Sequence, residues 1–68
     1  MTLTQKKIER AYQRAMDIRD STPGRVGLAV EDQYMNSYRS AYRNNDPRNF
    51  SIETRRYLKL VREAGRNE

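Results

Sequence analysis

The fold can be inferred from residues 51–65, which read Ser-Ile-Glu-Thr-Arg-Arg-Tyr-Leu-Lys-Leu-Val-Arg-Glu-Ala-Gly. Ser51 is a favourable helix N-cap, and Gly65 occupies the position where a helix C-cap is expected. Between them, apolar side chains recur at spacings of three and four residues, as they do on one face of a helix. We therefore predict an amphipathic helix over residues 51–64, with a buried face made of Tyr57, Leu58, Leu60, Val61 and Ala64.

Two earlier segments, residues 4–19 and 28–44, show the same helical spacing. The first stops at the Ser-Thr-Pro-Gly of residues 21–24. The second stops before Pro47, because the residue before a proline is driven away from helical angles. Thr22 and Pro23 would also make a good cap and first turn for the second helix. Glycines at 24 and 27 each disfavour a helix interior by about 1 kcal/mol, so we place its start near residue 28.

Three amphipathic helices with short connections predict an all-α fold, a small three-helix bundle with helices at roughly 4–19, 28–44 and 51–64. We expect one small basic domain spanning residues 1–68. A helical hairpin with a detached third helix is the alternative. The predicted interior contains seven side chains, namely Ile8, Ala15, Val30, Tyr34, Tyr38, Leu58 and Val61.

The composition argues against several classes of function. The 68 residues include no cysteine and no histidine, so the commonest general base, the strongest common nucleophile and the preferred ligands of zinc are missing. No Gly-rich phosphate loop is present either. We therefore predict a protein that is not an enzyme and uses no metal or cofactor. The longest uncharged apolar run, residues 26–30, is far below the roughly 20 residues of a membrane span. We expect no signal peptide, because no apolar stretch follows the lysines near residue 7. We expect no membrane association and a cytoplasmic location.

The chain is strongly basic, with 14 Lys and Arg residues against 9 Asp and Glu and a net charge of +5. Eleven of the 14 are arginines, whose guanidinium groups pair bidentately with phosphate or carboxylate. On the third helix, four cations at spacings of four, three and four fall within about 60° of arc and form a ridge about 16 Å long. They are Arg55, Lys59, Arg62 and Arg66, the last only if the helix continues past Gly65. Arg56 lies beside the ridge.

The first helix adds a second set of cations, Lys6, Arg10 and Arg14, on the side opposite its apolar face. We predict that these residues and the ridge bind nucleic acid or an acidic partner, because phosphate is the commonest ligand of such a surface. An ordinary solvated helix face is the alternative.

Tyr34, Tyr38 and Tyr42 follow one another at spacings of four along the second helix. Such a stripe is most often core or a helix–helix contact. It can also form an aromatic interface, stack on unpaired bases or pack on a second copy, which makes a homodimer possible.

The stretch Lys-Ile-Glu-Arg-Ala-Tyr-Gln-Arg at residues 7–14 resembles the opening helix of ribosome modulation factor. That family consists of small basic helical proteins that bind ribosomes. The Cys-Pro-Tyr segment and the tryptophan of the family's second half are absent from this chain, so the resemblance covers only the first helix.

Two functions follow from these patterns. The first is a nucleic-acid-associated protein that binds DNA or RNA through phosphate contacts. The alternative is a small interaction protein, of the kind that phages and plasmids use as inhibitors, docking its basic or aromatic surface on a host protein. A helix-turn-helix alignment puts Asp46 and Ser51 where buried apolar residues belong, so the sequence does not support that motif.

Overall fold

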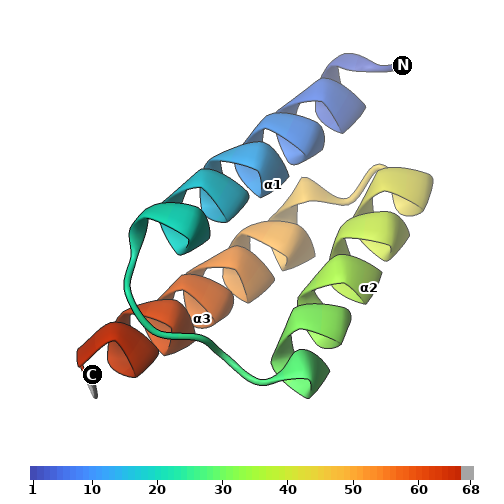
Figure 1. The fold of residues 1–68 in the computed structure, drawn as a ribbon. Coiled ribbons are helices and arrows are strands. Elements are labelled where there is room, and N and C mark those ends of the chain that lie inside the picture. The colour runs from blue at the N-terminus through green and yellow to red at the C-terminus, as the bar shows by residue number, and fades with distance from the viewer. Residues whose placement is uncertain (67–68) are drawn as a thin grey trace.

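The computed structural model describes residues 1–66. It contains three helices, α1 (Leu3–Ser21), α2 (Leu28–Asn44) and α3 (Pro47–Arg66). Figure 1 shows that α1 and α3 run in the same direction, while α2, which connects them in the chain, runs antiparallel to both. Each helix packs against both of the others. The predicted three-helix bundle is therefore confirmed, and the alternative with a detached third helix is wrong.

A capping box starts α1. The Thr2 hydroxyl accepts a hydrogen bond from the Gln5 backbone N–H at 3.0 Å, and the Gln5 side chain accepts one from the Thr2 backbone N–H at 2.9 Å. Two further bonds attach this end of α1 to the end of α2. The Thr2 hydroxyl donates to the Asn45 side chain at 3.0 Å, and the Gln5 amide donates to the Tyr42 carbonyl at 3.1 Å. These contacts fix the amino end of α1 beside the α2–α3 turn.

The start of α3 differs from the prediction. Asp46, and not Ser51, is the N-cap: its carboxylate accepts hydrogen bonds from the Asn49 backbone at 3.4 Å and from the Asn49 side chain at 2.8 Å. Pro47 then occupies the first helical position, where its fixed φ favours the helix and its missing N–H is not needed. The helix therefore begins four residues earlier than expected and brings Phe50 into the core.

Seven side chains form the core: Ile8, Ala15, Tyr34, Ala41, Phe50, Tyr57 and Val61. Four of the seven predicted interior residues are among them. The other three, Val30, Tyr38 and Leu58, are half-buried and pack against the core. Leu60, predicted to be buried, is 37% exposed because it lies at the edge of α3, where it borders a shallow hollow shared with Val30 of α2.

All six aromatic rings of the chain belong to one network of stacked and tilted rings at the centre of the bundle. Tyr34 stacks on Tyr57 with ring centroids 4.2 Å apart, and Tyr12 stacks on Tyr38 at the same separation. Phe50 lies 5.3 Å from Tyr34. The network therefore joins all three helices.

A polar bridge also joins the three helices, near the far end of α1. Arg19 of α1 donates to the Glu31 carboxylate of α2 at 2.8 Å, and Tyr57 of α3 donates its hydroxyl proton to the same carboxylate at 2.7 Å. Burial, together with the hydrogen bond to Glu31 and its negative charge, raises the pKa of Tyr57. The bridge holds α3 at a fixed distance from both partner helices.

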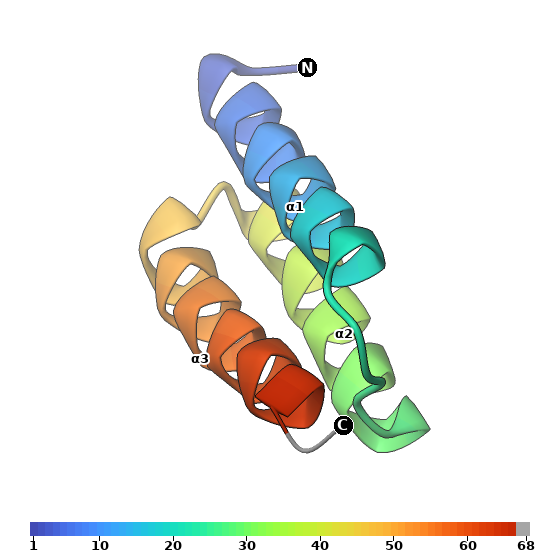
Figure 2. The same ribbon diagram turned by 60° about the vertical axis from the view of Figure 1, so that its left-hand side comes forward.

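The α1–α2 loop touches the last turn of α3. Gly24 has a φ of +90°, and a Cβ there would lie 2.5 Å from the Ala64 carbonyl oxygen. A Cβ on Gly65 would lie 2.8 Å from the Pro23 carbonyl oxygen. Figure 2 shows the loop passing this end of α3. Gly65 is thus a helical residue needed for close approach and not the predicted C-cap, and α3 continues to Arg66.

Candidate nucleic-acid interface

The outer face of α3 exposes the predicted cationic ridge. Arg55, Lys59, Arg62 and Arg66 are all exposed. The helix is unbroken through Gly65, so the condition for including Arg66 is met. The buried residues of α3 lie on the opposite side, which turns the ridge away from the bundle.

Arg48 extends this ridge and was not predicted to belong to it. The residue is exposed and lies seven positions, or two helical turns, before Arg55. With Arg48 the ridge extends over 18 residues of helix, which corresponds to about 27 Å at 1.5 Å per residue. The sequence prediction left Arg48 outside the helix because it took Ser51 as the cap. The Asp46-Pro47 pair was the signal that would have placed it correctly.

A groove between α1 and α3 brings cations from both helices together. Its volume is about 440 Å³. Arg10 and Arg14 line it from α1, and Arg62 lines it from α3. The rest of the lining is small or aliphatic except for one hydroxyl, and consists of Ala11, Ala15, Ile18, Thr54 and Leu58. The structure therefore joins the two predicted basic segments along one groove.

Lys6 does not reach this groove. It lines a neighbouring hollow on α1, which also contains Arg10, Gln13 and Arg14 and the carboxylates of Glu9 and Asp17. Lys7 is exposed and lies seven residues before Arg14, so helical spacing puts it on the groove side of α1. Neighbouring residues on a helix point about 100° apart, so Lys7 lies nearer to the groove side of α1 than Lys6 does, although neither residue lines the groove.

Within residues 1–66, three ion pairs form, and they involve only two cations. Arg19 pairs with Asp20 and Glu31, and Arg56 pairs with Glu53 at 3.4 Å. Arg56 is therefore partly neutralised beside the ridge. We use the term cationic face for the remaining exposed cations on these sides of α1 and α3: Lys7, Arg10, Arg14, Arg48, Arg55, Lys59, Arg62 and Arg66.

The tyrosine stripe of α2 points into the bundle. Tyr34 is 3% exposed and donates or accepts a hydrogen bond with the Thr54 hydroxyl at 2.9 Å. Tyr38 and Tyr42 are half-buried, and Tyr38 stacks on Tyr12 of α1 in the same chain. Tyr34 therefore offers no surface for an aromatic interface or for base stacking. The packing of Tyr38 within one chain also removes the reason for expecting a dimer through this stripe.

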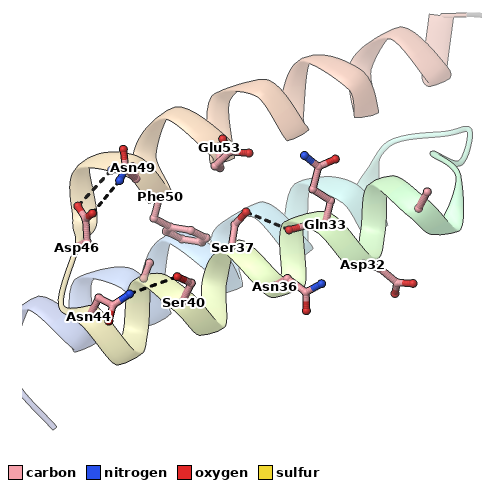
Figure 3. A pocket seen from close by; sticks show the side chains of 12 residues that line it. Asp32, Gln33, Asn36, Ser37, Ser40, Asn44, Asp46, Asn49, Phe50 and Glu53 are labelled. Atoms are coloured by element: carbon pink, nitrogen blue, oxygen red, sulfur yellow. Dashed lines mark hydrogen bonds between the residues drawn. The ribbon is translucent and has the colours of Figure 1, made fainter.

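A second groove, between α2 and α3, has a different lining. Figure 3 shows it from close by, with Phe50 and a set of amide and hydroxyl side chains. Its volume is about 720 Å³. Three carboxylates line it, from Asp32, Asp46 and Glu53, and no Lys or Arg is among its lining residues. No sequence pattern indicated this groove, because its residues come from two helices.

Within the described part of the chain, no three acidic side chains come close enough to hold a metal ion. No helix there is both long enough and apolar enough to cross a membrane. Comparison of the chain with protein-family models, with curated proteins and with solved structures finds no match. The short likeness of residues 7–14 to ribosome modulation factor therefore assigns no family.

Proposed function

We propose that this protein is a non-enzymatic binder of nucleic acid that contacts the phosphate backbone through the cationic face of α1 and α3. The observation that carries the proposal is the gathering of eight exposed cations, none ion-paired within residues 1–66, along one groove and one helix ridge. Six of them are arginines, which suit phosphate oxygens better than a hydrated ammonium does. We expect the protein to act in the cytoplasm.

An acidic protein surface is the competing partner. Protein interfaces concentrate their binding energy in buried aromatic and arginine anchors near the centre of the contact. Here every aromatic ring packs in the network at the centre of the bundle, and Ile52 is the one large apolar side chain more than half exposed on α3. A face rich in charge but without an aromatic anchor favours a partner that is recognised by summed charge, as a phosphate backbone is.

The test is a salt titration of binding to labelled DNA and RNA. Three to five phosphate contacts give a log–log slope of about −3 to −4.5 on a duplex. The variant with Arg55, Lys59 and Arg62 changed to Gln should lose most of this slope. We expect it to remain folded, because all three side chains are exposed.

The matched control changes Arg25, Arg39 and Arg43 to Gln, which removes the same charge from exposed positions on the α1–α2 loop and on α2. It should keep nearly the whole slope. An equal loss in both variants would mean that binding follows net charge and not this face. Absence of binding to either polymer at about 50 mM salt would overturn the proposal and favour the alternative, an inhibitor that binds a host protein.

A further inference from the structure

We infer that the cationic face binds double-stranded nucleic acid in preference to single strands. This inference rests on the proposed function and names the form of polymer that the face accepts. Three features of the structure carry it: where the aromatic rings lie, what lines the groove, and how long and straight the ridge is.

The first feature is the burial of the rings. Proteins that bind single strands combine a basic groove with aromatic side chains on which successive bases stack. All six rings of this chain, from α1, α2 and α3 alike, pack against one another, with four ring pairs stacked and two tilted. Tyr42, at the outer end of the network, is on α2 and tilts against Tyr38. No ring therefore belongs to the cationic face, and a single strand would gain no stacking there.

The second feature is the floor of the α1–α3 groove. Between the arginines it offers the methyl and methylene groups of Ala11, Ala15, Ile18 and Leu58. Four amide side chains that could read base edges gather instead in the groove between α2 and α3, namely Gln33, Asn36, Asn44 and Asn49. Gln13 is the amide that lies near Arg10 and Arg14, in the neighbouring hollow on α1. The α1–α3 groove itself therefore recognises charge and not the bases that a single strand exposes.

The third feature is the ridge itself. It follows one uninterrupted helix, so its cations hold a fixed, nearly straight line of about 27 Å. A duplex carries a negative charge every 1.7 Å or so along its axis, about twice the density of one strand, and about 8 base pairs match the ridge. Because both surfaces are already straight, neither needs to be ordered on binding, whereas a flexible strand does.

The preference can be estimated from counterion release. Each neutralised phosphate contributes a slope of about −0.9 on a duplex and about −0.7 on a single strand. We take the two affinities to be equal at about 1 M salt, where this electrostatic term vanishes. For three to five contacts, the difference between the two slopes then makes duplex binding roughly 6- to 20-fold tighter than single-strand binding at about 50 mM salt.

The experiment compares a labelled duplex of about 16 base pairs, twice the length of the ridge, with a non-pairing oligothymidine of the same length. We expect the duplex to bind about 6- to 20-fold more tightly at about 50 mM salt and to show the steeper slope. Equal or tighter binding of the single strand would overturn the inference while leaving the proposed function in place. Binding of neither polymer would overturn the proposed function itself.

A gain-of-contact variant tests the reason for the preference. Ile52 is 52% exposed on α3 between Arg48 and Arg55, so Ile52→Tyr puts one ring on the ridge. The matched control, Leu28→Tyr, puts the same ring at an 83% exposed position on α2. Ile52→Tyr should tighten oligothymidine binding several-fold and leave duplex binding nearly unchanged, while Leu28→Tyr should change neither. If the two variants bind oligothymidine equally, the missing ring does not set the preference and the argument fails.

Discussion

The two grooves beside α3 share one helix but carry opposite charge. The groove toward α1 is lined by three arginines and no carboxylate, and the groove toward α2 by three carboxylates and no cation. Arg62 faces the first and Glu53 the second, although they are only nine residues apart. The net charge of +5 is thus the sum of a basic side and an acidic side of the molecule. The comparison teaches that helical register, more than composition, decides where an anionic polymer can lie.

The largest expected effect comes from the core that supports both grooves. Phe50 is 2% exposed, lines the α2–α3 groove and contacts the tyrosine network. Phe50→Ala should cost about 3–5 kcal/mol, a large part of the stability of a small domain, and both grooves should be lost together. Thermal unfolding followed by circular dichroism measures the cost. Ile52→Ala, two residues away but half-exposed, is the control and should stay within about 0.5 kcal/mol of the native protein. A stable Phe50→Ala protein would show that the grooves do not depend on this core.

A smaller loss is expected where the α1–α2 loop meets α3. Gly24→Ser introduces a Cβ 2.5 Å from the Ala64 carbonyl oxygen at a φ of +90°, which should cost about 1–3 kcal/mol. The same change at Gly27 meets no atom within 4 Å and provides a better N-cap for α2, so it should be neutral or slightly stabilising. Denaturant midpoints compare the two. Because the contact involves the last turn of α3, Gly24→Ser should weaken phosphate binding as well. Equal stability of the two serine variants would show that the loop is not held against α3.

The third prediction concerns pH. Burial raises the pKa of Tyr34 and Tyr38, and burial together with Glu31 raises that of Tyr57. Tyrosines of an unfolded chain titrate near pH 10. The folded protein holds these protons more tightly than the unfolded chain does. The contribution of the three tyrosines to the free energy of unfolding is therefore complete below about pH 10 and decreases as the pH rises above it.

The measurement is the free energy of unfolding between about pH 8 and 11. Tyr57→Phe should cost about 1–3 kcal/mol at neutral pH, because Glu31 loses a donor, and should flatten the alkaline decline. An unchanged decline in Tyr57→Phe would assign it to the other tyrosines. No decline at all would contradict the raised pKa values.

The smallest effect should come from the α2–α3 groove. Asp32→Asn removes one negative charge from its lining, at an exposed position on α2. If nucleic acid lies on the α1–α3 side, this variant should change duplex affinity less than about threefold, since exposed charges more than a Debye length away, about 10 Å at 0.1 M salt, are largely screened. Arg10→Gln with Arg14→Gln, in the other groove, should weaken binding about tenfold or more at about 50 mM salt. Comparable changes from the two variants would contradict the distinction between the grooves.

The three-helix architecture, the ridge on α3 and five of the seven buried residues, Tyr57 among them, could be predicted because helical periodicity is a local property. The start of α3 was missed because Ser51 and Asp46 are both acceptable caps, and only the burial of Phe50 decides between them. Leu60 was misplaced for a related reason. A helix shows which residues share a face, but how far that face extends depends on where its neighbours pack.

The α1–α3 groove could not have been predicted from either helix alone. Arg14 and Arg62 are 48 positions apart in the sequence, and they line the same groove only because α1 and α3 pack side by side in parallel. The tyrosine stripe shows both what spacing predicts and where it stops. Tyr34 and Tyr38 were predicted to lie inside, and Tyr34 is buried while Tyr38 packs against the core, but the spacing on α2 could not show that both rings stack on Tyr12 of α1.

The ring network also gives the molecule its own optical probe. The chain has five tyrosines and no tryptophan, and every tyrosine packs against another aromatic side chain within the bundle. Near-ultraviolet circular dichroism therefore reports on one site only, the centre where the three helices meet. Its loss while the far-ultraviolet signal persists would reveal a state in which the helices survive but the rings no longer interlock. Loosening of the bundle can thus be followed without attaching a dye or replacing a single residue.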